Sequence, residues 1–406
     1  MSTWKAGKRR FTREKIRLMW AVFRQAECVF TICLIMLFST SQEVFAAVED
    51  VSESDVLIEK LMEELDFSGL DSFLEDFESD ITFYELVVQI MEEGWGADSI
   101  EMLTRWLWKQ IFSELQANKT LFLEVVLIAF CFSLLKNTAG SFGNVYISDA
   151  CFLVVYSVLA LLLFKSMYIF QSIVAESLGQ CVSFMQMFVP CFCTGMFLTS
   201  NVHASAGFYQ LAFLAIYLVE WAFETVLLPC IHIYVLLQIF NHFFEEGQFG
   251  NLAELVETVI NWGIKASMTI ILGLSAVQNL MNPVKDRMTQ GTLSKAVSAI
   301  PGVGNAVGGM GEVLLGSGMM IKNGIGLAGI VILILIGIGP LLKTGCLTLS
   351  YKVMAAVTEP LTDKRISSCI KDLSIGAILY MKLLGYSLML FFVMIAIAVS
   401  ATSFVY

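Results

Sequence analysis

The chain has 406 residues, of which 57% are hydrophobic and only 15% are charged, and its mean hydropathy is +0.74. A soluble domain carries about 25% charged residues, so this composition excludes an ordinary soluble protein and predicts an all-α, polytopic membrane protein. The formal net charge of −11 is concentrated in residues 47–119, which carry nineteen acidic and four basic side chains.

Residues 1–46 have the order of a secretory signal peptide. A basic segment reaches residue 27, an apolar stretch runs from Cys28 to Phe38, and Val44 and Ala46 meet the small-residue requirement of signal peptidase. We therefore expect cleavage after Ala46, which N-terminal sequencing of the mature protein would check. The alternative is an uncleaved signal anchor, and both possibilities place residue 48 and those after it outside the cytoplasm.

Residues 47–119 form a separate, acidic extracytoplasmic region. Apolar residues at helical spacing in Val56–Leu65, Phe73–Phe77 and Ile81–Met91 predict short amphipathic helices, and Asp98 suits the N-cap of a further helix. The acidic faces of these helices fit either a solvated surface or a docking site for a basic partner.

Residues 120–406 form the polytopic membrane domain, because their apolar runs approach or exceed the ~20 residues that cross a bilayer. The expected spans are 121–135, 150–170, 182–199, 207–244, 259–280, 326–342 and 376–400. The run 207–244 is too long for one perpendicular helix and contains Pro229. It is either one tilted helix kinked at Pro229 or a hairpin that turns just before it, so the domain has seven to eight transmembrane helices.

The distribution of charge favours the hairpin. The positive-inside rule counts basic residues in short loops. The hairpin places six basic residues inside and four outside, whereas the single helix places equal numbers on the two sides. These basic residues include those of the charged connections Asn282–Arg287 and Thr358–Ile366. The hairpin also moves Glu220 and Glu224 from the bilayer interior, where an acid costs about 2.5–3.5 kcal/mol, to the outer interface. We therefore predict eight spans and a C-terminus outside the cytoplasm.

Residues 300–329 are unusually rich in glycine, with ten glycines among thirty residues. Small residues let transmembrane helices approach closely. Candidate helix-packing or pathway residues are Gly304, Gly308, Gly324, Gly326 and Pro340. The segment is either a mobile or tightly packed lining of a pathway, or a set of ordinary packing glycines together with a loop. A phosphate-binding loop is excluded because the pattern G-x-x-x-x-G-K-[ST] is absent.

Four ionisable residues lie inside apolar runs: Glu220, Glu224, Lys265 and Lys382. Such residues are functional candidates by default, here as a proton relay or a cation site. The alternative places the two glutamates at a helix end beside Trp221, at the level of the lipid headgroups. Hydrolase and nucleotide-binding motifs are absent, and the ten cysteines show no metal-binding spacing. We therefore expect no enzymatic activity, cofactor, metal or nucleic acid.

The chain resembles the stage III sporulation protein AE family in four segments. It also shares the family's order of signal peptide, extracytoplasmic region and membrane domain. The four segments are Ile300–Gly304, Ile321–Gly326, Pro340–Lys343 and Glu359–Ile366. The resemblance is sharpest over residues 295–370 and extends over most of the mature chain.

The resemblance implies a multi-pass protein of the mother-cell membrane that surrounds the forespore. It implies a core subunit of the stage III sporulation A complex, a secretion-like channel with ATPase-like and ring-forming subunits that meets stage II sporulation protein Q from the forespore side. A stand-alone ion- or proton-coupled secondary transporter, coupled through Glu220, Glu224 and Lys265, is the alternative.

Overall fold

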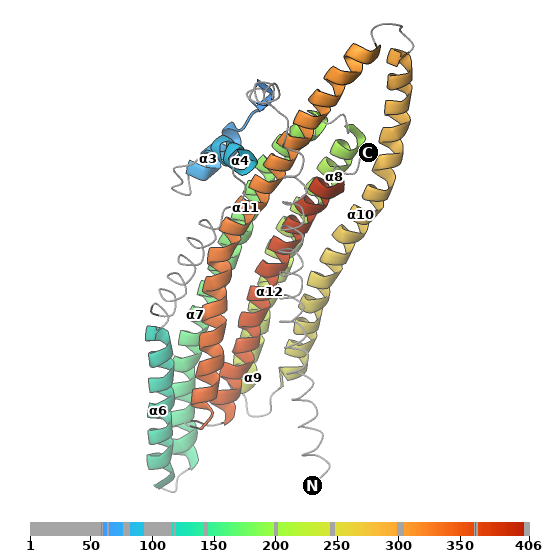
Figure 1. Cartoon of the computed structure of the whole chain (residues 1–406). Coiled ribbons are helices and arrows are strands. Elements are labelled where there is room, and N and C mark those ends of the chain that lie inside the picture. The colour runs from blue at the N-terminus through green and yellow to red at the C-terminus, as the bar shows by residue number, and fades with distance from the viewer. Residues whose placement is uncertain are drawn as a thin grey trace. The chain divides into compact units, whose positions relative to one another are not determined.

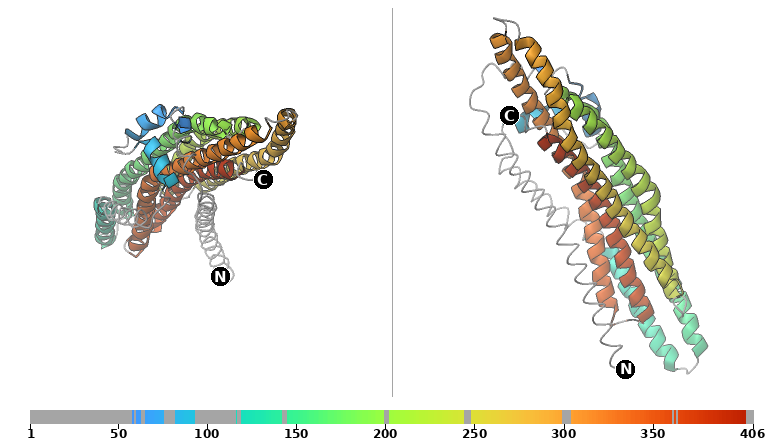
Figure 2. Two further views of the ribbon diagram at one scale, coloured as in Figure 1. Left: turned by 45° about the horizontal axis from the view of Figure 1, so that its top comes forward. Right: turned by 90° about the vertical axis from the view of Figure 1, so that its right-hand side faces the viewer.

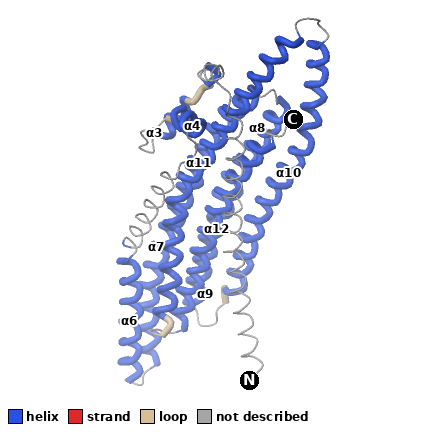
Figure 3. Tube along the Cα trace, viewed as in Figure 1, coloured by secondary structure: helices blue, strands red, loops and turns tan. Residues whose placement is uncertain are grey.

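The computed structural model describes residues 58–92 with gaps, 116, 119–141, 145–198, 202–243, 248–298, 304–360, 362 and 364–401, in places giving the path of a helix without its side chains. Every regular element in these ranges is a helix (Figure 3). The expected all-α fold is therefore confirmed. The predicted signal peptide and the helix expected at Asp98 lie outside the described residues.

Long helices make up the membrane domain (Figure 1). In chain order they are α6 (Lys119–Ser141), α7 (Val145–Leu198), α8 (Val202–Leu218), the π-helix η1 (Val219–Leu227), α9 (Leu228–Phe243), α10 (Gly250–Ser298), α11 (Gly304–Thr358) and α12 (Lys364–Ala401). Helix α11 packs against α7 and α12, and α9, α10 and α12 pack against one another. Figure 2 shows α11 and α12 side by side from two further directions.

Five stretches of the described chain are long and apolar enough to cross a membrane, and α6 adds the shorter apolar stretch Phe122–Cys131. The five are Phe152–Phe197, Ala206–Phe243, Gly250–Leu274, Gly316–Thr358 and Lys364–Val399. They make the chain an all-α protein of the polytopic membrane class.

Several breaks predicted from the sequence do not exist. The expected spans 150–170 and 182–199 are parts of the single helix α7, and 202–243 is helical throughout, so the predicted hairpin before Pro229 is wrong. The expected connection Asn282–Arg287 lies inside α10, whereas Thr358–Ile366 does join α11 to α12. In the same way α11 continues past Pro340 to Thr358, and residues 304–329 are helix, not loop.

The helix continues past Pro229 because its winding changes just before the proline. A proline lacks the amide that would bond the carbonyl four residues earlier, and its ring clashes with that carbonyl. The preceding residues form η1, where the Leu228 amide donates to the Phe223 carbonyl, five residues back. The Thr225 hydroxyl likewise donates to the Glu220 carbonyl at 3.3 Å. A local π-helix thus absorbs the proline without a turn.

Two short helices of the acidic region, α3 (Ser68–Glu75) and α4 (Phe83–Glu92), are capped by side chains. Asp66 accepts hydrogen bonds from the Ser68 hydroxyl and amide at 2.6 and 3.1 Å, and these bonds lower the pKa of the Asp66 carboxyl. Thr82 and Glu85 form a capping box, in which each side chain accepts from the amide of the other residue. Asp71 of α3 also accepts from the Phe83 amide at 2.7 Å, so the start of α4 is held both by its own sequence and by α3.

The apolar faces of α3 and α4 pack onto the membrane domain. The rings of Phe73 on α3 and Phe184 on α7 lie 5.7 Å apart. Met91 and Val87 of α4 lie against Gly324 of α11, within 2.9 and 3.2 Å of where a Cβ atom would stand. Gly326, one half-turn further along α11, contacts Val399 near the end of α12. The acidic region and the C-terminal end of α12 therefore lie at the same end of α11.

We predict from this arrangement that the C-terminus lies outside the cytoplasm. If residues 47–119 are extracytoplasmic, the end of α12 beside them is also outside, and the α11–α12 connection is inside. That orientation places Lys352, Lys364, Arg365 and Lys371 at the cytoplasmic end, as the positive-inside rule requires. In a variant without native cysteines, a cysteine added after Tyr406 should react with an impermeant maleimide in intact cells.

The matched control is Glu359→Cys in the exposed α11–α12 connection, which should react only after permeabilisation. The reverse labelling pattern would show that the chain crosses the membrane with the opposite orientation.

Candidate functional site

The glycine face of α11 is where two neighbouring helices, α7 and α12, dock. A Cβ atom on Gly326 would collide with Val399 of α12 and Phe192 of α7, and one on Gly329 would collide with the ring of Phe188. A Cβ on Gly337 would stand 2.5 Å from Leu388 of α12. Because these contacts occupy the space of the missing side chains, α11 packs closely on both neighbours.

A column of aromatic rings on α7 fills this face. Phe184, Phe188 and Phe192 stack in sequence with ring centroids 5.5 Å apart, and Phe208 of α8 meets Phe192 edge-on at 5.2 Å. Rings in a stack have little freedom to move aside. The column therefore makes the glycines of α11 difficult to replace.

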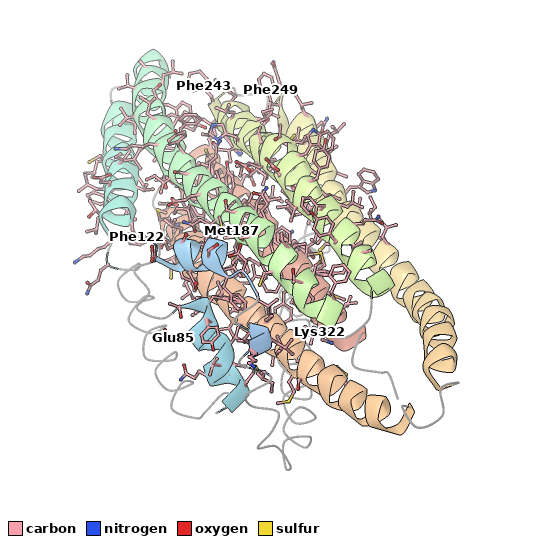
Figure 4. All side chains as sticks on the ribbon, turned by 90° about the horizontal axis from the view of Figure 1, so that it is seen from above. Glu85, Phe122, Met187, Phe243, Phe249 and Lys322 are labelled. Atoms are coloured by element: carbon pink, nitrogen blue, oxygen red, sulfur yellow. The ribbon has the colours of Figure 1, made fainter. Side chains whose placement is uncertain are left out.

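Lys322 lies at the head of the glycine face and is fully buried (Figure 4). Its ammonium donates to the carbonyl of Val399 at 3.2 Å. Val399 lies in the last turn of α12, which ends at Ala401. Lys322 thus caps α12, and a cation there is also favoured by the helix dipole.

The structure separates the glycines predicted from the sequence. Gly324 contacts α4, and Gly326 contacts α7 and α12. Gly304 and Gly308 lie at the start of α11, in the part of that helix whose side-chain surroundings the structure does not describe. Pro340 lies within α11, where the Thr344 hydroxyl donates to its carbonyl at 2.9 Å.

The ionisable residues predicted from the sequence are not gathered into one site. Glu220 is exposed and Glu224 is half-buried on η1, in the middle of a continuous helix, so their placement at a helix end is wrong. Lys265 is exposed on α10, and among the described residues it makes no ion pair with either glutamate. Lys382 is half-buried on α12 and donates to the Asn261 Oδ1 atom of α10 at 3.1 Å.

Sequence reasoning missed Lys322, Gly329 and Gly337. The sequence did contain a pattern that could have identified them. One face of a helix would carry Lys322, Gly326, Gly329 and Gly337 at this spacing. It also missed the pair of His242 on α9 and Asp372 on α12, 2.8 Å apart, which no spacing reveals. Among the described residues, no group of three or more His, Cys, Asp or Glu side chains could hold a metal ion.

Comparison with known proteins identifies relatives. The family model described as stage III sporulation protein AE matches residues 81–402. Stage III sporulation protein AE of Bacillus subtilis (strain 168) is 23% identical over 297 residues, which cover 73% of this chain and 74% of that protein. No solved structure matches the chain.

The first prediction from this site concerns the packing glycines. Gly329→Ala should lower the free energy of unfolding by about 1–3 kcal/mol, because the added methyl group collides with the Phe188 ring. Gly339→Ala on the same helix is the control, since nothing lies within 4 Å of its Cβ position. Thermal unfolding of the full-length protein in detergent measures both. Equal midpoints for the two variants would show that the glycine face is not closely packed.

The second prediction concerns the cap on α12. Lys322→Met keeps most of the side-chain volume but leaves the buried Val399 carbonyl without this donor, at a cost of about 1–3 kcal/mol. Amide hydrogen exchange in the last turn of α12 should therefore accelerate. Lys371→Met, an exposed lysine near the other end of α12, should leave that turn unchanged. Unaltered exchange in Lys322→Met would contradict the capping role.

Proposed function

The chain belongs to the stage III sporulation protein AE family, and from this we propose that it is a non-catalytic integral-membrane core subunit of the stage III sporulation A complex. Membership implies a role in sporulation. The proposal adds a place: the mother-cell membrane around the forespore, within a secretion-like channel that links the two cells. Its direct partners would be the secretion-ATPase-like and ring-forming subunits, with stage II sporulation protein Q as an indirect one.

The observation that best supports a subunit role is the length of the apolar surface on α7. Large apolar side chains are exposed between Leu153 and Ile169, with Val154, Leu161 and Tyr168 each more than 60% exposed, and again at Met187 and Phe197. These residues extend over about 66 Å of helix. The hydrocarbon core is ~30 Å thick, and even a helix tilted by ~40° has only ~39 Å inside it.

The remaining apolar surface of α7 cannot be covered by lipid hydrocarbon. Exposed apolar surface that neither water nor lipid suits marks interaction sites. A neighbouring protein subunit would cover this part of α7, which is what a core subunit of a membrane complex requires and a stand-alone transporter does not.

The transporter alternative has less support. Its coupling residues Glu220, Glu224 and Lys265 do not form a common site, and Glu220 and Lys265 face outward. Spore formation by the Glu220→Gln/Glu224→Gln double variant distinguishes the two functions. Loss of spores at a normal protein level would favour the transporter.

Co-purification tests the proposed function directly. The tagged chain is isolated in mild detergent from sporulating cells, and the proteins bound to it are identified by mass spectrometry. Secretion-ATPase-like and ring-forming subunits should accompany it in reproducible amounts. A tagged polytopic protein unrelated to sporulation, purified from the same cells, is the control. Recovery of the chain without these subunits, from cells that contain them, would contradict the proposal.

A further inference from the structure

We propose that a polar layer between α9, α10 and α12 is a proton-binding site within the membrane domain. The layer consists of Tyr234, Gln238 and His242 on α9, Glu257 and Asn261 on α10, and Asp372 and Lys382 on α12. It is distinct from the glycine face of α11, and the inference holds whether or not the chain is a subunit of a complex.

Contacts along the three helices place these residues at matching levels. On α9 and α12, His242 pairs with Asp372, Gly376 packs on Val235 and Tyr234, and the Tyr380 hydroxyl lies 3.4 Å from His232 Nδ1. The two helices are therefore antiparallel.

Helix α10 is antiparallel to α9 as well. Gly250 lies beside Asn241, and Gly263 lies beside Leu227 of η1. Along α10, Glu257 lies midway in sequence between Gly250 and Gly263. Along the facing helix, Tyr234 lies midway in sequence between Leu227 and Asn241. Glu257 therefore lies at the level of Tyr234, in the middle of the layer.

Charges and hydrogen bonds connect the members of the layer. The Asn261 amide donates to the Glu257 carbonyl at 2.9 Å, which turns its Oδ1 atom toward the Lys382 ammonium, 3.1 Å away. Glu257 and Asn261 are four residues apart on α10, so they share the helix face that Lys382 contacts through Asn261. The layer thus extends from the His242–Asp372 pair to Glu257, Asn261 and Lys382.

Gln238 supplies an independent sign of a bound polar species. Its side chain is only 8% exposed, and its Nε2 atom donates to the Tyr234 hydroxyl at 3.2 Å. Its Oε1 atom accepts no hydrogen bond from any group that the structure describes. A buried acceptor without a donor is costly and calls for a functional explanation. Because the Nε2 atom of the same amide bonds Tyr234, the Oε1 atom lies beside it at the layer, where it can accept a hydrogen bond from a protonated group or a hydrated proton.

The composition of the layer favours a proton over a metal ion. No cluster among the described residues has the three His, Cys, Asp or Glu ligands of a metal site. Carboxylates and histidines in sequence inside a membrane are instead typical of proton relays. A proton would enter at His242 and Asp372, whose side chains are 15% and 30% exposed, and bind to the Glu257 carboxylate. Glu257 becomes neutral, Lys382 keeps its bond to Asn261, and the layer gains one positive charge.

Other titratable groups surround the layer on the packed helices. They are Tyr156 of α7, which bonds the Ile239 carbonyl and the Cys369 thiol of α12, His232 with Tyr380, the exposed Lys265 of α10, and Glu224 of η1. A purely structural layer would hold the helices together through these hydrogen bonds without taking up a proton. The experiment has to separate that role from proton binding.

Infrared difference spectroscopy measures protonation of a carboxylate directly. Full-length protein is reconstituted in vesicles of phosphatidylethanolamine and phosphatidylglycerol, and spectra are compared as the pH is lowered. We expect a carboxylic-acid C=O band that is lost in Glu257→Gln. Glu254→Gln is the matched control, because Glu254 is an exposed carboxylate three residues earlier on α10 and its removal should leave the band unchanged.

Glu257→Asp keeps a carboxyl group, so it shows whether the band is lost in Glu257→Gln because the carboxyl is missing or because the protein misfolds. In that variant the band should persist with a shifted pH midpoint, and Lys382→Gln should also shift the midpoint. A band that is the same in wild type, Glu257→Gln and Glu257→Asp would overturn the proposal, as would the absence of any such band in the folded wild type. Co-purification of partner subunits is unaffected by either result, so failure here is distinct from failure of the proposed function.

Discussion

The close approach of α11 to α7 and α12 is the constraint on which the rest of the fold depends. Inside a bilayer, lipid tails are as apolar as side chains, so helices associate by close packing and hydrogen bonds and gain little from hydrophobic burial. Gly326, Gly329 and Gly337 provide that packing by leaving space for Val399, Phe188 and Leu388. The same approach brings Lys322 within reach of the Val399 carbonyl, so packing and capping at this end of α12 require each other.

The fold class could be predicted from composition, but helix ends could not. The sequence predicted a turn just before Pro229, yet Pro229 lies inside a continuous helix, as do Pro190 in α7 and Pro340 in α11. A membrane offers no water to a broken backbone, so local adjustment costs less than a turn. Threonine hydroxyls four residues later bond the carbonyls of Pro190 and Pro340, and η1 precedes Pro229. At Pro229 the π-helix is a local compensation that hydropathy does not detect, whereas the two threonine hydroxyls bond the prolines' own carbonyls and not the carbonyls four residues before them.

The candidate site was predictable only where a residue's role depends on its own size. Gly324 and Gly326 could be found because closely packed glycines leave a visible spacing in the sequence. The roles of Lys322, Asp372 and Lys382 depend on partners 77, 130 and 121 residues away, and those pairings arise only when the helices are assembled. Glu220 and Glu224 illustrate the reverse case, since they share a helix face in sequence but face outward or half-outward in the structure.

Helix α12 carries both regions on one rigid element. Near its C-terminal end Val399 bonds Lys322 and packs on Gly326, whereas Asp372 near its N-terminal end and Lys382 in its middle belong to the polar layer. No turn separates these positions, because α12 is helical from Lys364 to Ala401. A change of charge at Glu257 would therefore be felt by a helix whose opposite end is fixed to α11. Closely packed helices resist gradual deformation, so a response would take the form of a shift of α12 between discrete packings against α11.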